Sequence, residues 1–121
     1  MKIFTLLFIF NGTLLLLHEI ESAYEKEWEI LNLPGRITGF LLLHIPIIFL
    51  LFYGVIEVEK ESTTGFIMGI IMGVGGILPF IVHKILVKRA GCFNGWISNM
   101  IIGLNAVTGV GLLVFSVWFL A

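Results

Sequence analysis

The chain has 121 residues, of which 59% are hydrophobic and only 12% are charged. About a quarter of the residues of soluble domains are charged, so this composition excludes a soluble globular domain. The acidic residues are all glutamates, the net charge is −1, and the sequence has no basic tract of the kind that binds nucleic acid. The single cysteine, Cys92, excludes a disulfide within the chain and a metal site built from several cysteines.

Four apolar stretches predict membrane-spanning helices. They cover residues 3–23, 37–56, 65–86 and 96–120. Each approaches the roughly 20 residues that a helix needs to cross a hydrocarbon layer of about 30 Å. The polar segments between them are too short for a second domain. We therefore predict an all-α fold, an integral membrane four-helix bundle in which residues 1–121 form a single transmembrane domain within the lipid bilayer.

The first stretch has some features of a signal peptide. Lys2 precedes an apolar run that ends near the small residues Ser22 and Ala23. However, the polar cluster His18-Glu19-Ile20-Glu21 occupies the place of a small-residue cleavage site, which favours a retained helix.

The positive charges predict how the bundle is oriented. Five of the seven Lys and Arg residues lie in the first and third loops, namely Lys26, Arg36, Lys84, Lys88 and Arg89. The positive-inside rule then places these two loops in the cytoplasm and both termini outside, in the inner membrane of a prokaryotic cell. Cys92 would lie in a reducing compartment, which suits an unpaired thiol.

Small and polar residues mark the faces of the last two stretches that contact other helices. Gly65, Gly69 and Gly73 follow one another at four-residue spacing, which lets another backbone approach closely. A helix of the same chain is the favoured partner, and a homo-oligomer through these glycines is the alternative. On the last stretch one stripe is polar, which favours hydrogen bonds between helices over a polar conduit; it comprises Ser98, Asn105, Thr108, Gly109 and Ser116.

Histidines and glutamates predict a site near the cytoplasmic face. His18, His44 and His83 each lie six to eight residues from a loop charge, which places all three at one depth, about 9 to 12 Å from those charges. At 100° per residue, Glu21, Ser22 and Glu25 share the face of His18. Glu19 points about 100° away, toward a neighbouring helix or the interface. Asn99 and Ser22 are candidates for supporting positions around the site.

Imidazoles beside carboxylates suit a divalent metal such as zinc, iron or manganese, with an open position for water or substrate. We assign His18, His44, His83 and Glu21 as candidate metal ligands, and Glu25 with His18 as candidate catalytic residues. Two alternatives remain open. The same groups suit metal-free proton transfer, and they also suit a buried hydrogen-bonded network that only sets helix register.

The end of the first stretch carries a resemblance to known proteins. The segment Leu17-His18-Glu19-Ile20-Glu21-Ser22-Ala23-Tyr24 resembles a family of small uncharacterised prokaryotic membrane proteins with four helices, and also the HXXEE domain. His18 and Glu21 match the first and fourth positions of the His-x-x-Glu-Glu motif, whereas Ser22 replaces its fifth. The resemblance implies a membrane protein with a polar site and names no reaction.

Together these features favour a metal-assisted membrane enzyme acting on a lipid or another amphipathic substrate. One alternative is a non-catalytic structural or interaction subunit that packs through the glycine face. The other is a small oligomeric carrier of protons or metal ions. The sequence does not decide whether the protein is an enzyme.

Overall fold

The structure, a computed structural model, describes residues 1–85 and 95–121 and confirms the all-α bundle. The described helices are α1 (Ile3–Tyr24), α2 (Glu27–Ile30), α3 (Arg36–Glu59), α4 (Thr63–Ile85) and α5 (Trp96–Leu120). All but the short α2 are long and apolar enough to cross a membrane. These four helices match the predicted stretches closely. The predicted end at residue 86, and Lys88, Arg89 and Cys92, lie outside the described residues.

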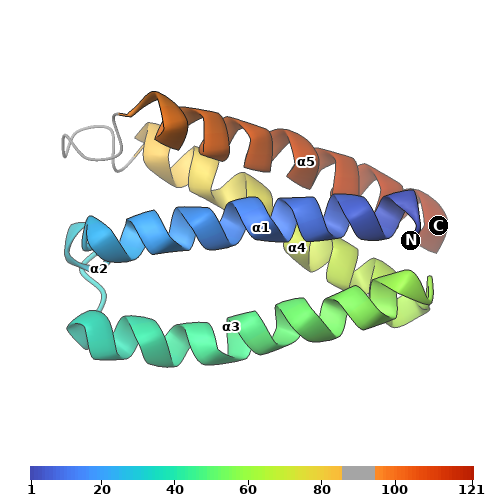
Figure 1. Ribbon diagram of the computed structural model, residues 1–121, viewed down its shortest axis with the longest axis horizontal. Helices are drawn as coiled ribbons and strands as arrows, with labels where there is room; N and C mark the ends of the chain where they lie inside the picture. The colour runs from blue at the N-terminus through green and yellow to red at the C-terminus, as the bar shows by residue number, and fades with distance from the viewer. Residues whose placement is uncertain (86–94) are drawn as a thin grey trace.

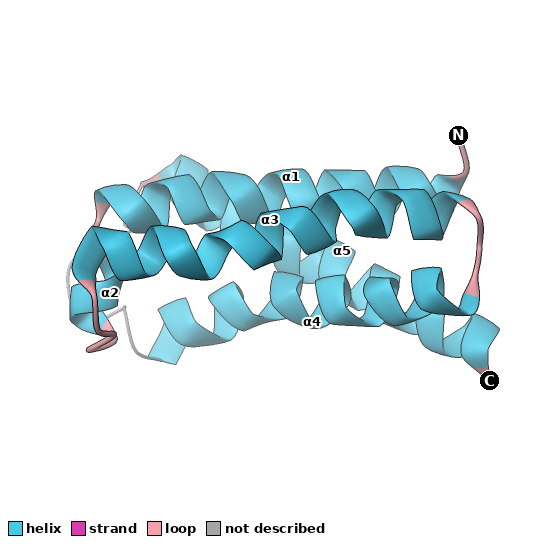
Figure 2. Cartoon of the chain, turned by 90° about the horizontal axis from the view of Figure 1, so that it is seen from below, coloured by secondary structure: helices cyan, strands magenta, loops and turns pink. Residues whose placement is uncertain are grey.

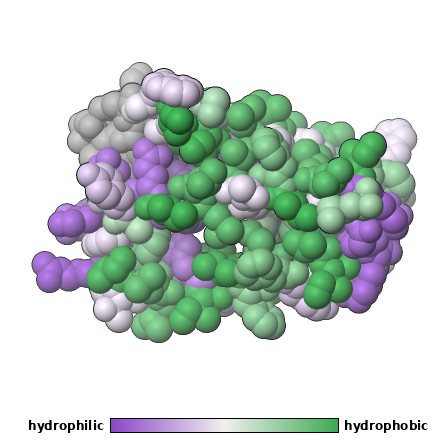
Figure 3. Space-filling view, viewed as in Figure 1, coloured by the Kyte–Doolittle hydropathy of each residue, from purple (hydrophilic) through white to green (hydrophobic). Residues whose placement is uncertain are grey.

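The four long helices lie side by side. The polar segments that connect them therefore gather at the two ends of the bundle. The N- and C-termini lie at one end, and α2 lies at the other (Figure 1). Helix α1 contacts α3, α4 and α5, and α4 also packs against α5 and α3. After a turn of 90° the four long helices again lie alongside one another, with α3 in front of α1 and α4 beside α5 (Figure 2). A wide apolar surface separates polar groups at the two ends (Figure 3), as a membrane-spanning bundle requires.

The glycine face of α4 packs within the chain. A Cβ atom on Gly73 would lie 2.7 Å from the carbonyl oxygen of Gly109 on α5, and one on Gly109 would lie 2.6 Å from the carbonyl oxygen of Gly73. A Cβ on Gly69 would meet the hydroxyl of Ser116 and the ring of Phe4. Because glycine has no side chain, the two backbones approach each other directly, as the favoured interpretation of the spacing predicts.

Hydrogen bonds between helices also hold the middle of the bundle. The Asn11 side chain on α1 is fully buried, and its amide nitrogen donates to the carbonyl of Met72 on α4 at 3.1 Å. Its amide oxygen accepts from the hydroxyl of Thr108 on α5 at 2.7 Å. Ser98, Asn105 and Ser116 are buried, so the predicted polar stripe of α5 does face the protein. Such bonds stabilise helix association in a layer that offers no water as a partner.

Candidate metal centre

The three histidines come together near the α2 end of the bundle, as their common depth predicted. His18, His44 and His83 have exposed fractions of 2%, 9% and 7%. The rings of His18 on α1 and His83 on α4 meet edge to face, with centroids 4.7 Å apart. Three helices therefore deliver imidazoles to one buried region.

The carboxylate that joins His18 and His83 is Glu27, which lies in α2. Helix α1 ends at Tyr24, and Lys26 then adopts a left-handed conformation with φ 51°. This turn directs the four residues of α2 back against the end of the bundle, where Glu27 and Trp28 are both 8% exposed. The chain reversal thus places a carboxylate beside helices that it does not belong to.

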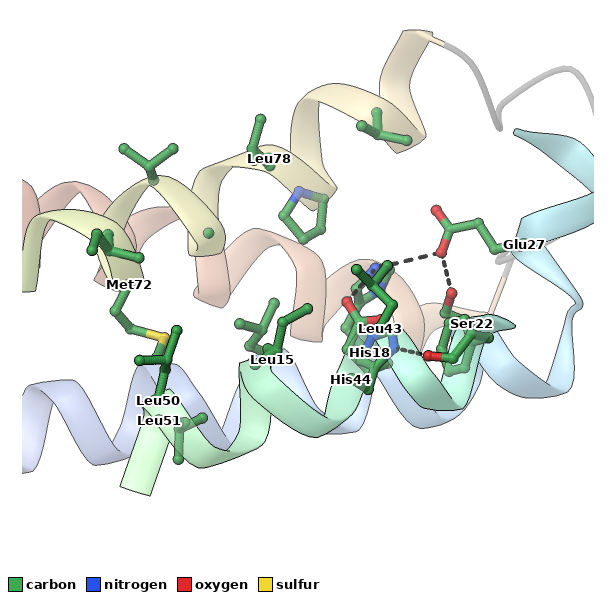
Figure 4. A pocket seen from close by; sticks show the side chains of 18 of the residues that line it. Leu15, His18, Ser22, Glu27, Leu43, His44, Leu50, Leu51, Met72 and Leu78 are labelled. Carbon is green, nitrogen blue, oxygen red and sulfur yellow. Dashed lines mark hydrogen bonds and ion pairs between the residues drawn. The ribbon is translucent and has the colours of Figure 1, made fainter. Parts of the chain in front are cut away.

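Glu27 contacts both histidines at once. Its Oε1 lies 3.4 Å from Nε2 of His83, and its Oε2 lies 3.9 Å from Nε2 of His18. The hydroxyl of Ser22 donates a hydrogen bond to Oε2 of Glu27. Figure 4 shows the contacts of the Glu27 carboxylate with Ser22 and His18 as dashed lines. Ser22 therefore supports the site, as the sequence suggested, and it does so by holding Glu27.

The surroundings of Glu27 favour its ionised form. Burial acts to raise the pKa of this carboxyl. The hydrogen bonds from His83 and Ser22, together with the charges that His18 and His83 carry when protonated, outweigh burial and lower the pKa below its ordinary value. Glu27 is thus a carboxylate, the form in which it can bind a metal ion.

His44 belongs to a separate pair with Glu19. Its Nδ1 lies 2.6 Å from the carbonyl oxygen of Phe40, and its Nε2 lies 2.8 Å from Oε2 of Glu19. Because a carbonyl oxygen only accepts hydrogen bonds, Nδ1 carries a proton, and one further proton lies between Nε2 and Glu19. The other oxygen of Glu19 is 4.0 Å from Nε2 of His18. Glu19 thus reaches a neighbouring helix, as its direction on α1 predicted, and connects the two groups.

The remaining residues predicted for the site do not belong to these two groups. Glu21 and Glu25 are half-buried, and neither belongs to the group formed by His18, Glu27 and His83. Asn99 is exposed, and its neighbour Ser98 is the buried polar residue in the first turn of α5. The geometry of a straight helix could not reveal Glu27, because α1 stops before it. A weak signal was present in Trp28, Ile30 and Leu31, whose apolar side chains suggest a segment that returns to the bundle.

His18, Glu27 and His83 form a donor set that suits a divalent ion. One ligand atom from each residue lies within 4.8 Å of the others, and all three residues are buried. Two ligands about 2.1 Å from a tetrahedral zinc ion are about 3.4 Å apart. This value equals the distance of 3.4 Å between Nε2 of His83 and Oε1 of Glu27. A separation at the upper limit of 4.8 Å would have to shorten by about 1.4 Å, a change within reach of side-chain rotation. Two histidines and one carboxylate also form the ligand set of catalytic zinc and iron(II) sites with open positions.

A cavity of about 660 Å³ lies beside this group, between α1, α3 and α4. Five polar residues line one end of it, namely His18, Glu19, Ser22, Glu27 and His44. Apolar side chains line the rest, and Figure 4 shows Leu15, Leu50, Leu51 and Met72 leading away from the polar end. His83 does not line the cavity but contacts His18 and Glu27, which line its polar end.

Fold and site together define a four-span membrane protein with a buried histidine and glutamate group at the polar end of an amphipathic cavity. The chain belongs to the Family of unknown function DUF6713, which matches residues 4–118. No curated protein and no solved structure matches the chain. The family membership agrees with the expected class of uncharacterised proteins, and the more distant resemblance to the HXXEE domain stays a prediction.

Proposed function

We propose that the protein is a membrane-embedded, metal-dependent enzyme that acts on a lipid or another amphipathic substrate. The observation that carries the proposal is the approach of His18, Glu27 and His83 within 4.8 Å of one another. Ionisable groups are costly inside a membrane, on the order of 2.5 kcal/mol or more each, so two histidines of membrane-spanning helices that converge with a buried carboxylate beside a cavity favour a functional role.

The residues have distinct roles in this proposal. His18, His83 and Glu27 hold the ion, which is zinc, iron or manganese, and Ser22 orients the Glu27 carboxylate. A bound ion of this kind polarises a substrate oxygen or generates hydroxide from water. The pair of Glu19 and His44 lies at the same polar end of the cavity, where it can hydrogen-bond a substrate headgroup.

The orientation belongs to the same proposal. The polar end of the cavity lies at the α2 end of the bundle, opposite both termini (Figure 1). Lys26 and Arg36 lie at this end, and the positive-inside rule assigns such an end to the cytoplasm. The proposed enzyme would therefore take its substrate from the cytoplasmic leaflet of a prokaryotic inner membrane.

The test is the metal content of the full chain after purification without chelators. Elemental analysis should find about one zinc, iron or manganese ion per chain. Glu27→Gln and His83→Ala should each lose most of it, because each removes one of three ligands. Glu29→Gln is the matched control, because Glu29 is exposed and lies in the same short helix.

The same measurement separates the structure-based ligand set from the one predicted from the sequence. Glu21→Gln, Glu25→Gln and His44→Ala should keep the ion if His18, Glu27 and His83 hold it. Loss of the ion from Glu21→Gln with retention in Glu27→Gln would overturn the assignment of Glu27. A wild-type protein that neither contains nor takes up any of the three metals would overturn the metal-dependent function. It would favour the non-catalytic alternative, in which the histidines and glutamates only join helices.

A further inference from the structure

We propose that the cavity binds a single acyl chain of a lipid, with the lipid headgroup at the polar end and the chain between α1, α3 and α4. The apolar part of the cavity, lined by Leu15, Leu50, Leu51, Met72, Gly75 and Leu78, is here called the chain site. This inference rests on the proposed function for the identity of the headgroup end, and it goes further in naming the class of substrate.

The polarity of the cavity changes along its length in the way that a lipid requires. All of its ionisable lining residues lie at one end. The chain site continues from them along the helices without another charged group. A small polar ligand would leave this apolar surface uncovered, whereas an acyl chain covers it while its headgroup lies at the polar end, where the histidine rings can donate hydrogen bonds.

The length of the apolar part of the cavity fits an acyl chain. On α1 the lining residues of the cavity extend from Ser22 to Phe8, and the part beyond the polar end covers the ten residues from His18 to Phe8. These ten residues correspond to about 15 Å at 1.5 Å per residue. The hydrocarbon layer is about 30 Å thick, so one leaflet contributes about 15 Å. The part of the cavity beyond His18 thus has about the length of a lipid chain in a single leaflet.

The exposed side chains of α3 indicate where an acyl chain can enter the cavity. Ile47, Leu43 and Leu50 line the cavity, yet 38%, 54% and 46% of their surfaces are exposed. A large part of this wall of the cavity is therefore not covered by the other helices. Figure 3 shows the surface hollowed between α1 and α3. A lipid chain can enter from the bilayer at this side without crossing water.

Gly75 offers a way to close the chain site without disturbing the bundle. A Cβ atom at this position would meet only the side chain of Leu15, at an ordinary contact distance of 3.8 Å. Gly75 lies eight residues before His83, about 12 Å along α4. A larger side chain at residue 75 would therefore occupy the site about midway along the membrane and leave the headgroup end intact.

Photo-crosslinking tests the inference on the full chain in lipid nanodiscs. The probe is palmitic acid with a diazirine midway along its chain, and a second arm uses phosphatidylcholine carrying the same acyl chain. We expect crosslinks on Leu51 and Met72, which line the chain site. The arm that labels them more strongly identifies a free fatty acid or a phospholipid as the source of the chain. Crosslinks confined to exposed residues outside the cavity, such as Phe49 and Phe52, would overturn the inference.

Gly75→Leu should lower this labelling at least about tenfold, which corresponds to about 1.4 kcal/mol. Octanoic acid should still compete with the probe in wild type, since a short chain occupies the headgroup end. Gly103→Leu is the matched control, because Gly103 is a helical glycine on α5 with nothing within 4 Å of its Cβ position and does not line the cavity. If Gly75→Leu does not fold, Ile47→Phe fills the same cavity from α3. Labelling at wild-type level in the folded variant would overturn the inference.

Metal content, measured on the same samples, distinguishes the two proposals. Gly75→Leu should keep the ion, because the substitution lies about 12 Å along α4 from the ligand His83. A metal-containing protein without labelling in the chain site contradicts the acyl-chain inference alone. Labelling in the chain site of a protein that takes up no metal contradicts the proposed metal-dependent function and leaves a lipid-binding cavity.

Discussion

Gly73 on α4 faces the backbone of α5 so closely that the smallest added side chain should separate the two helices. In Gly73→Ala the new Cβ would lie 2.7 Å from the carbonyl oxygen of Gly109 and 3.1 Å from the amide nitrogen of Leu113. Ordinary contact begins at 3.4 Å, so the backbones must move apart by about 0.7 Å. Overpacking of this kind costs about 1 to 3 kcal/mol.

A second glycine provides the reference for this cost. Alanine has a higher helix propensity than glycine by about 1 kcal/mol, which partly offsets the loss in Gly73→Ala. Gly103→Ala receives the same gain without a clash, because nothing lies within 4 Å of its Cβ position. The free energies of unfolding of the two variants should therefore differ by about 1 to 3 kcal/mol, or about 5- to 150-fold in the unfolding equilibrium.

Circular dichroism during unfolding in mixed micelles measures this difference. The helical signal of each variant is followed while the fraction of denaturing detergent increases, and the midpoints are compared. Equal stability of Gly73→Ala and Gly103→Ala would refute the close contact between α4 and α5. It would also refute the assignment of the glycine face to packing within one chain.

Three further outcomes follow from the structure. Metal affinity, measured by zinc titration, should fall as the pH is lowered, because protons compete with the metal ion for imidazole and carboxylate ligands; an affinity that does not depend on pH would contradict ligation by His18, His83 and Glu27. The pKa of Glu27 is lowered in the folded protein, so its contribution to stability is present above the ordinary glutamate pKa of about 4.3 and is lost as the pH falls through the lower folded value. The free energy of unfolding of wild type should therefore approach that of Glu27→Gln as the pH falls in acid unfolding experiments. A difference in free energy that stays constant with pH would contradict the lowered pKa of Glu27. A membrane-impermeant thiol reagent should label Cys92 only after the cells are opened, whereas labelling in intact cells would reverse the predicted orientation.

The sequence predicted in part which residues come together, and particular residues show why. His18, His44 and His83 could be placed at one depth because each helix advances by a constant rise from a charged loop. The direction of Glu19 was likewise accessible, because its angle from His18 is set within a single helix. Glu21 and Glu25 were reasonable candidates on the same grounds, since they share the face of His18 on a straight helix.

Glu27 shows where such reasoning stops. Its position depends on the left-handed conformation of Lys26 and on the packing of Trp28 against the bundle, neither of which is set by helix geometry. The division of the histidines into two groups is also a tertiary effect. His44 lies on α3 and meets Glu19, whereas His83 lies on α4 and meets Glu27.

By itself, the sequence determined that the chain forms four membrane-spanning helices and that its scarce ionisable residues gather toward one end. Hydrophobicity and helical rise act along the chain, so both can be read without knowing which helices are neighbours. Only the tertiary structure decided that Glu27 joins His18 and His83, and that a largely apolar cavity begins there. Contacts of this kind depend on how separate helices pack and where the chain turns back, and no local pattern encodes either.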